Sequence, residues 1–454
     1  MSRSRESTYK KAPKASPSLP VVNPHAAGID VGSDSMYVSV PTDSSPTPVA
    51  KFGAFTPDLQ ALSSWLKECG VQSVAMESTG VYWIPLFEIL EAQGFAVTLV
   101  SPNYPKKPHK TDVEDCQWLQ YLHSVGLLRG SFRPPATVCA IRSILRHRGD
   151  LVTQATADLQ RMQKSLIQMN LLLHNVISDI SGTTGTAIID AILAGERDPA
   201  VLSQHRDPRI KASAEEIEKS LIGNYRAEHL FTLRQSRQAL KFHREQIQQC
   251  DAEIAQMLKA IDAVPPVHPL LASGSPGPKP RRNEINLPGA DTRSEMLRMN
   301  GVDLTQIPGI GPSAACVIFS EIGSDLSRFP TLAEFCSWLR LCPDPNISGG
   351  QTLARRPRPA KSPLSCLLRQ VTQSLHHSRT YLGDFYRRIK AKHGPAVAAK
   401  ATAHKIARII YAMLTTKTAY DETRFNEAQN RAAEKRVSRF LKEAQRLGYE
   451  VAAA

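Results

Sequence analysis

The sequence predicts an α/β domain, then a long helical region, then a second and mostly helical domain. Between residues 25 and 148, short runs rich in β-branched residues alternate with helical stretches, a rhythm typical of α/β layer structures. Beyond residue 148, Leu, Ile and Met recur at three- and four-residue steps among Gln, Lys, Glu and Arg, which indicates amphipathic helices. A chain of 454 residues is long enough for about two to four domains of ordinary size.

The first domain is expected at residues 25–148, after a Ser-, Pro- and Lys-rich stretch at 1–24 typical of a flexible basic tail. Alternating apolar residues predict strands over 26–33, 36–41, 49–55, 72–77 and 95–102. Helical spacing predicts helices over 59–70, 82–93 and 111–128. Thr111 is a suitable N-cap for the last of these helices, and acidic residues follow it where the helix dipole favours them.

The helical region is expected at residues 149–263. Two long helices are predicted, from 150 to about 175 and from 213 to 263, paired in a coiled-coil-like hairpin. Residues 264–300 are predicted to be a linker, because seven prolines lie between Pro265 and Pro288. The second domain then spans 301–420, and a charged helical tail spans 421–454.

Positive charge is concentrated in one segment of the chain. The formal net charge is +14, yet residues 346–420 contain 14 Lys and Arg against the single acidic residue Asp384, so this segment carries +13. Such a concentration favours a surface for phosphate backbones, with a solvated basic face as the plainer alternative. The candidate nucleic-acid-binding residues are Arg355, Arg356, Arg358, Lys361, Arg387, Arg388, Lys390 and Lys392.

Cysteine usage and hydropathy predict a reduced, cytoplasmic protein. The eight cysteines form no C-x-x-C pair and no cluster with zinc spacing. Nowhere do 18 apolar residues follow one another, and no apolar core follows the basic start of the chain. We therefore expect neither export nor membrane insertion.

Four carboxylates of the first domain are candidate metal ligands. Asp30 lies in a strand with a glycine on each side of its Ile-Asp-Val triplet, which leaves room for a ligand, and Glu77 ends another strand. If these strands are neighbours, both carboxylates lie at one sheet edge, and Asp112 and Asp115 share one helix face that could reach it. Two Mg²⁺ ions about 4 Å apart would neutralise such a set and support phosphodiester chemistry. Individually, Asp112 could only cap its helix, Glu77 could be an ordinary strand-end charge, and Asp34 competes with Asp30.

The second domain contains a candidate nucleophile. Ser348 precedes two glycines and lies just before Arg355 and Arg356, so that the glycines could expose its hydroxyl and the arginines could stabilise charge on phosphorus. An S-G-G sequence is equally typical of a simple turn. Upstream, the P-G-I-G of residues 308–311 resembles a helix-hairpin-helix turn that binds phosphate through backbone N–H groups, or a mere helix connection.

A second arrangement of catalytic residues competes with this one. His376, Arg379, His404 and Tyr411 follow the order of groups found in tyrosine recombinases. Tyr411 lies within the apolar helical run IARIIYAML, where packing is the simpler role. Tyr381 and Tyr386 are predicted to be helix-surface aromatics.

From about His25 to Tyr420 the chain resembles the insertion sequence 110 family of transposases, which is also labelled 116 and 902. The stretches that carry the resemblance are AAGIDVGSDSMYVSV, AMESTGVYWIPLFEIL, KTDVEDCQWLQYLHSVGLLRGSFRP, LTQIPGIGPSAACVIFSEIG, SRFPTLAEFCSWLRLCPDPNISGG and TQSLHHSRTYLGDFYRRIKAKHG. The segment after Ser348 departs from the family, since prolines occur at 357, 359 and 363 where relatives continue more helically.

The resemblance implies a ribonuclease-H-like domain of the RuvC type, whose D-E-D-D set matches Asp30, Glu77, Asp112 and Asp115. It also implies a C-terminal transposase domain whose catalytic serine matches Ser348. In the family the helical middle forms a coiled coil for oligomerisation, and carboxylates of one protomer complete a site with the serine of another. We therefore expect a homodimer or homotetramer.

The implied activity is strand cleavage and exchange on donor and target DNA, with two Mg²⁺ ions and a structured noncoding guide RNA, the bridge RNA. Two alternatives remain. A RuvC-like junction resolvase or nuclease would use water with the carboxylates, and a nucleic-acid-binding scaffold would have no catalytic turnover.

Overall fold

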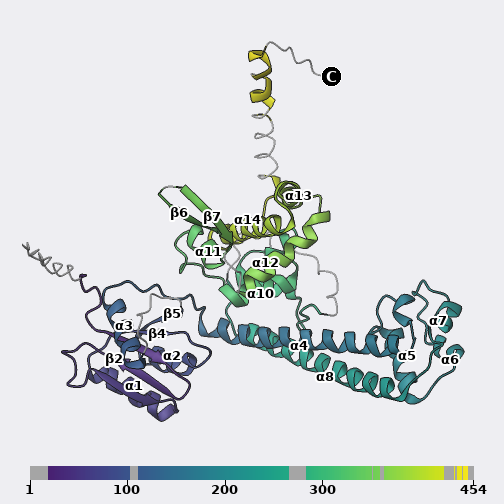
Figure 1. The fold of residues 1–454 in the computed structure, drawn as a ribbon, viewed down its shortest axis with the longest axis horizontal. Coiled ribbons are helices and arrows are strands. Elements are labelled where there is room, and N and C mark those ends of the chain that lie inside the picture. The colour runs from purple at the N-terminus through teal and green to yellow at the C-terminus, as the bar shows by residue number, and fades with distance from the viewer. Residues whose placement is uncertain are drawn as a thin grey trace, which may run out of the picture. The chain divides into compact units, whose positions relative to one another are not determined.

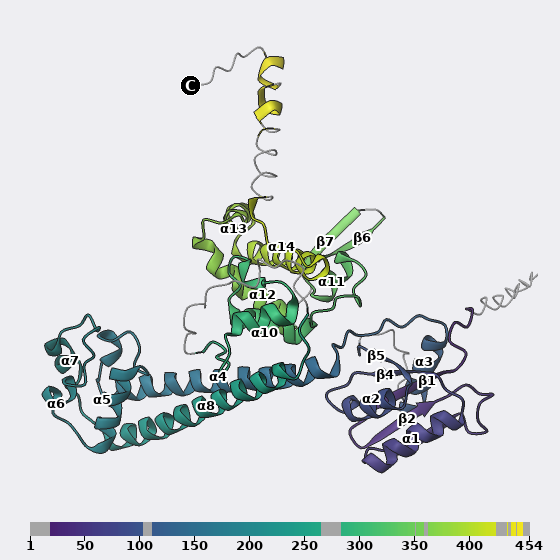
Figure 2. The same cartoon turned by 180° about the vertical axis from the view of Figure 1, so that it is seen from behind.

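The protein is described as a computed structural model of residues 19–102, 111–264, 283–349, 351–357, 362–423, 434, 437–441 and 443–447. The chain divides into two compact units, residues 1–133 and 134–454, which are treated separately below (Figures 1 and 2). The division precedes residue 148, the predicted limit of the first domain, because the first long helix begins at Ala136, directly after two prolines.

The first unit is built on a mixed five-stranded sheet in the order β3-β2-β1-β4-β5. Its strands are β1 (Ala26–Val31), β2 (Ser35–Ser39), β3 (Val49–Gly53), β4 (Ser73–Glu77) and β5 (Ala96–Val100). Strand β1 is antiparallel to β2 and parallel to β4, and β4 is parallel to β5. All five strands occur where the sequence predicts them, which confirms an N-terminal α/β domain.

Helices cover both faces of this sheet: α1 (Thr56–Glu68), α2 (Trp83–Ala92) and α3 (Asp112–Ser124). Ile29, Val74 and Met76 pack in one core with leucines of α1 and α2. Ala75, which alternates with them, packs instead with Leu119 of α3. Since side chains along a strand alternate between faces, α1 and α2 cover one face and α3 the other.

The second unit contains a long pair of helices, α4 (Ala136–Gln168) and α8 (Ala227–Lys259), which lie side by side in Figures 1 and 2. Arg148 contacts Asp251, and Asp158 contacts His243, so the two helices are antiparallel. The second predicted helix comes as two, because α7 (Ala214–Ser220) ends before α8 begins. Between them lie η1 (Leu173–Asn175), α5 (Thr183–Ala194) and α6 (Pro199–Ser203).

The rest of the second unit is mostly helical, as predicted. It comprises α9 (Thr292–Asn300), η3 (Leu304–Gln306), α10 (Pro312–Ile322), α11 (Leu332–Trp338), β6 (Pro343–Ser348), β7 (Gln351–Pro357), α12 (Pro363–Ser374), η4 (Leu375–His377), α13 (Tyr381–His393) and α14 (Pro395–Thr416). Two features differ from expectation: α9 lies within the predicted linker, and β6 and β7 form an antiparallel hairpin. Residues 265–282 of the linker, residues 1–18 and most of the predicted tail lie outside the described residues. Within the described chain, no helix is both long and apolar enough to cross a membrane.

Candidate active site

Asp30 and Glu77 lie at the carboxyl ends of adjoining parallel strands. The register pairs Ile29 of β1 with Met76 of β4, so Asp30 and Glu77 are the next residues along the two strands. Each follows a residue that faces α1 and α2, so alternation directs both carboxylates to the α3 face. Glu77 is only 6% exposed, and Asp30 is partly buried. The sheet thus brings two of the four predicted carboxylates to one edge and one face.

Helix α3 is seated directly on β1, through Gly28. A Cβ at Gly28 would lie 2.2 Å from the backbone N of Gln120 and 2.4 Å from the backbone O of Cys116. The space that this glycine leaves is therefore filled by the helix backbone, and the sequence-based interpretation that it makes room for a ligand is wrong. A close backbone approach of this kind is possible only without a side chain.

The first turn of α3 carries the other two carboxylates. Thr111 caps the helix as predicted, since its Oγ1 accepts a hydrogen bond from Glu114 N at 3.2 Å. Asp112 is exposed, whereas Asp115 is only 3% exposed. A capped helix N-terminus favours both negative charges electrostatically. A residue that only stabilises the N-terminus of a helix does not need to be buried, so the burial of Asp115 points to a further role.

Asp30 and Asp115 both act electrostatically on the buried Cys116 thiol of α3. Burial, the main cause, together with the negative charges of Asp30 and Asp115 raises the pKa of the Cys116 thiol to about 12. On the other side, Thr79 Oγ1 donates a hydrogen bond to Glu77 Oε1 at 2.9 Å and so orients that carboxylate. Asp34, the competing residue, is exposed in the turn between β1 and β2.

The donor set fits a hard divalent cation in its chemistry. Carboxylate oxygens are the ligands that Mg²⁺ prefers, and Glu77 and Asp115 are buried charges that a cation would neutralise. Among the residues that the structure describes, no three His, Cys, Asp or Glu side chains are gathered closely enough to hold a metal ion. The backbone thus places Asp30 and Glu77 at matching positions on neighbouring strands. The carboxylate groups of the four candidate residues do not form a compact cluster in this structure.

Ser348 lies at the tip of the β6–β7 hairpin. It is the last residue of β6 and pairs with Gln351, so only Gly349 and Gly350 connect the strands. Gly349 has φ of 57°, a conformation that glycine adopts without strain and that tight hairpin turns require. Two of the three prolines fit the local structure, since Pro357 ends β7 and Pro363 begins α12, while Pro359 lies outside the described residues. The P-G-I-G turn lies separately, between η3 and α10.

The predicted nucleic-acid-binding residues divide by environment. Arg387 is held within the protein, because its guanidinium donates to the carbonyl oxygens of His376 at 3.0 Å and Ser378 at 2.6 Å and pairs with Asp384. Lys390 Nζ lies 3.2 Å from His376 Nε2, and its charge lowers the pKa of that imidazole. The remaining predicted residues are Arg388 and Lys392, exposed on α13; Arg355 and Arg356, on β7; and Arg358 and Lys361, outside the described residues.

Tyr411, the tyrosine of the tyrosine-recombinase alternative, is engaged in packing. The Tyr411 hydroxyl donates to the carbonyl oxygen of Phe329 at 2.9 Å, and its ring lies 5.6 Å from that of Phe335. Tyr381 and Tyr386, predicted to lie on the surface, are instead 8% and 6% exposed. Helix α13 packs against α14 and η4. This packing buries both tyrosines on α13, which the sequence pattern alone does not predict.

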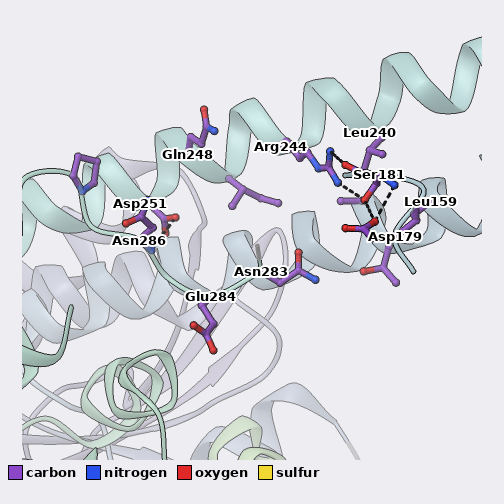
Figure 3. A pocket seen from close by; sticks show the side chains of 14 residues that line it. Leu159, Asp179, Ser181, Leu240, Arg244, Gln248, Asp251, Asn283, Glu284 and Asn286 are labelled. Atoms are coloured by element: carbon purple, nitrogen blue, oxygen red, sulfur yellow. Dashed lines mark hydrogen bonds between the residues drawn. The ribbon is translucent and has the colours of Figure 1, made fainter. Parts of the chain in front are cut away.

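A large cleft in the second unit lies apart from these residues. It measures about 780 Å³ and is bordered by α4, α8 and residues 283–288 (Figure 3). Its described lining includes Asp179, Arg244 and Asp251, and none of the predicted site residues. Arg244 donates to Ser181 Oγ at 2.8 Å in this cleft, as Figure 3 shows.

Comparison with known protein families decides the identity of the chain. Residues 27–171 match a family model described as a transposase, of the DEDD type of IS110 elements, and residues 303–387 match the transposase IS116/IS110/IS902 family. The chain belongs to the IS110 family of transposases. It is thus an enzyme, a DNA transposase whose substrate is DNA, and its DEDD domain implies use of a divalent metal ion. No curated protein matches the chain.

The structure adds one residue to the candidate site and changes the role of another. Thr79 was not among the candidates, although it lies two residues after the end of β4, and Gly28, which the sequence indicated as room for a ligand, instead seats α3. The seating of α3 on Gly28 depends on long-range packing, for which the sequence has no local signal.

Proposed function

We propose that this transposase cleaves and exchanges DNA strands to move its own element, using Asp30, Glu77, Asp112 and Asp115 to bind two Mg²⁺ ions and Ser348 as nucleophile. The observation that carries the proposal is the alignment of Asp30 and Glu77 on the face of the sheet that α3 covers. The strand order and the antiparallel β1–β2 pair support a ribonuclease-H-like fold of the RuvC type.

The carboxylates would hold the metal ions, which supply Lewis-acid stabilisation of the nucleophile and the leaving oxygen. Thr79 keeps one oxygen of Glu77 oriented. The seat of α3 on Gly28 sets the distance of Asp112 and Asp115 from β1. In this proposal the carboxylates bind the metal ions, and Thr79 and Gly28 position the carboxylates. The fold thus arranges these groups before DNA binds.

In the proposed cleavage step, the Ser348 Oγ forms a bond to phosphorus, and the bond from phosphorus to one deoxyribose oxygen breaks. The hydroxyl proton leaves to a base, and the departing oxygen takes up a proton. Attack by the hydroxyl of the exchanged strand then reverses the step and frees Ser348. The position of Ser348 at a two-residue turn supports this role, because a hairpin tip can enter a groove of DNA.

The proposed partners are donor DNA, target DNA and a structured noncoding guide RNA, which together would occupy the basic segment of residues 346–420. We also propose a homodimer or homotetramer, assembled through a coiled coil of α4 and α8, in which Ser348 of one protomer serves the carboxylates of another. Eight cysteines without a disulfide among them support action in the reducing cytoplasm.

Separate Asp112→Asn and Ser348→Ala variants test the proposal, in a recombination assay between donor and target plasmids with the RNA of the element. We expect each variant to lose recombination and retain DNA binding. Asp34→Asn and Gln351→Ala are matched controls, since they alter an exposed carboxylate beside β1 and the strand partner of Ser348.

The outcomes separate the alternatives. Normal recombination by Ser348→Ala, with activity lost in Asp112→Asn, would favour a resolvase or nuclease that uses water. Wild-type behaviour of both variants would favour the binding scaffold.

A further inference from the structure

The loop that follows Glu77 is rigidly held by hydrogen bonds. Ser78 anchors it to β5, because its backbone N and its Oγ both donate to the carbonyl oxygen of Val100, at 2.8 and 3.0 Å. Trp83 Nε1 donates to the carbonyl oxygen of Gly80 at 3.2 Å. Gly80 has φ of 55°, which lets the chain turn sharply at this point. The loop is thus an ordered platform and not a loose connection.

This platform presents two apolar side chains to solvent. Val81 is 67% exposed and Tyr82 is 47% exposed. The Tyr82 ring extends over Gly80, since a Cβ there would lie 3.4 Å from two ring carbons. Exposure of large apolar groups on an ordered loop is unfavourable in water and is typical of a binding surface.

The location of the pair indicates its ligand. Tyr82 follows Glu77 by five residues, which can span at most about 18 Å, and Thr79 of the same loop contacts the Glu77 carboxylate. Any DNA strand whose phosphate reaches the carboxylate edge must place its neighbouring nucleotides near this loop. An aromatic ring beside an apolar side chain is the surface on which an unpaired base stacks.

We propose that Val81 and Tyr82 form a base-stacking site that receives an unpaired nucleobase next to the scissile phosphate. Tyr82 is then a positioning residue, because it fixes the register of the DNA strand at the carboxylates without taking part in the chemistry. This inference rests on the proposed function of the carboxylate edge. It adds the requirement that the DNA be locally unpaired there.

The test uses the full-length chain in EDTA, so that no cleavage occurs, and a DNA duplex with a short unpaired bubble that carries 2-aminopurine. We expect the wild type to quench the fluorescence of 2-aminopurine by stacking. Tyr82→Ala should lose the quench and bind the bubble more weakly by about 5- to 100-fold, whereas binding to the fully paired duplex changes little. Tyr82→Trp should restore both signals.

Tyr121→Ala is the matched control. Tyr121 is 41% exposed, and the end of α3 on which it lies is at the opposite edge of the sheet, where His123 contacts Ser73 at the start of β4. An unchanged quench in Tyr82→Ala, an equal loss in Tyr121→Ala, or a folded Tyr82→Trp that does not quench would each overturn the inference. A change in the solution mass of the DNA-free protein on Tyr82→Ala would also overturn it, by assigning the pair to a protein contact.

These readouts do not depend on catalysis. Active Asp112→Asn with intact quenching would refute the proposed function alone, and an inactive Asp112→Asn with no Tyr82-dependent quenching would refute the inference alone.

Discussion

Replacement of Gly28 by alanine tests whether the seat of α3 on β1 positions the carboxylates. The new Cβ would meet the backbone N of Gln120 at 2.2 Å and the backbone O of Cys116 at 2.4 Å. Neither atom belongs to a flexible side chain, so α3 must retreat by about 1.2 Å to reach the 3.4 Å of ordinary contact. Overpacking of this kind costs about 1–3 kcal/mol of stability.

The same retreat moves Asp112 and Asp115 away from Asp30. A displacement of about 1 Å at a catalytic group can lower the rate about 100-fold. We expect Gly28→Ala to unfold at lower urea concentration, followed by tryptophan fluorescence, and to cleave DNA about 100-fold more slowly under conditions where it is folded. Gly130→Ala is the control, because its Cβ would meet only Thr98 Cγ2, at 3.5 Å. Wild-type stability and cleavage in Gly28→Ala would refute the reasoning.

Three further predictions concern the rest of the chain. Arg148→Met should destabilise the second unit by about 3–5 kcal/mol in urea unfolding, because it removes the cation that pairs with the buried carboxylate of Asp251. The double variant Arg148→Met with Asp251→Leu should recover most of that lost stability. Equal destabilisation by the single and the double variant would contradict this prediction. Burial lowers the pKa of His123, so the unfolded chain takes up a proton near pH 6.5 while the folded chain stays neutral. Stability should therefore fall as pH drops below about 6.5, and His123→Gln should flatten this dependence in thermal unfolding; an unchanged slope would contradict the assignment. Tyr411→Phe should lower the free energy of unfolding by about 0.5–1.5 kcal/mol, because it removes the hydrogen bond to the carbonyl oxygen of Phe329, and it should keep full recombination activity. A folded Tyr411→Phe variant without recombination activity would instead support Tyr411 as the nucleophile.

The α/β domain could be predicted from the sequence because its signals are local. Alternation of apolar residues marks each strand, and the two runs that contain Asp30 and Glu77 are short, apolar and bounded by turns. The sequence does not show that these two strands are neighbours. If they are assumed to be parallel neighbours, the common position of Asp30 and Glu77 at one edge of the sheet follows. The N-cap of α3, Thr111, could also be predicted from the sequence, since capping depends on residues only three positions apart.

Other features depend on contacts between distant residues and could not be predicted. The β6–β7 hairpin includes three prolines among its strand residues, which lower strand propensity, and its pairing overrides that local preference. In the sequence Arg387 is indistinguishable from the other basic residues of its segment. Only the folded chain shows that its guanidinium donates to the carbonyl oxygens of His376 in η4 and of Ser378 just after it. The buried state of Tyr386 likewise depends on what packs against α13.

The most direct test of the central claim is identification of the residue that becomes linked to DNA. The transposase is incubated with its guide RNA and a suicide donor substrate whose cleaved end cannot be rejoined, and the adduct is digested and sequenced by mass spectrometry. The account predicts a nucleotide on the peptide that contains Ser348, absent in both Ser348→Ala and Asp112→Asn and absent without a divalent metal ion. An adduct on Tyr411 or on any other residue, or efficient cleavage without an adduct, would contradict it.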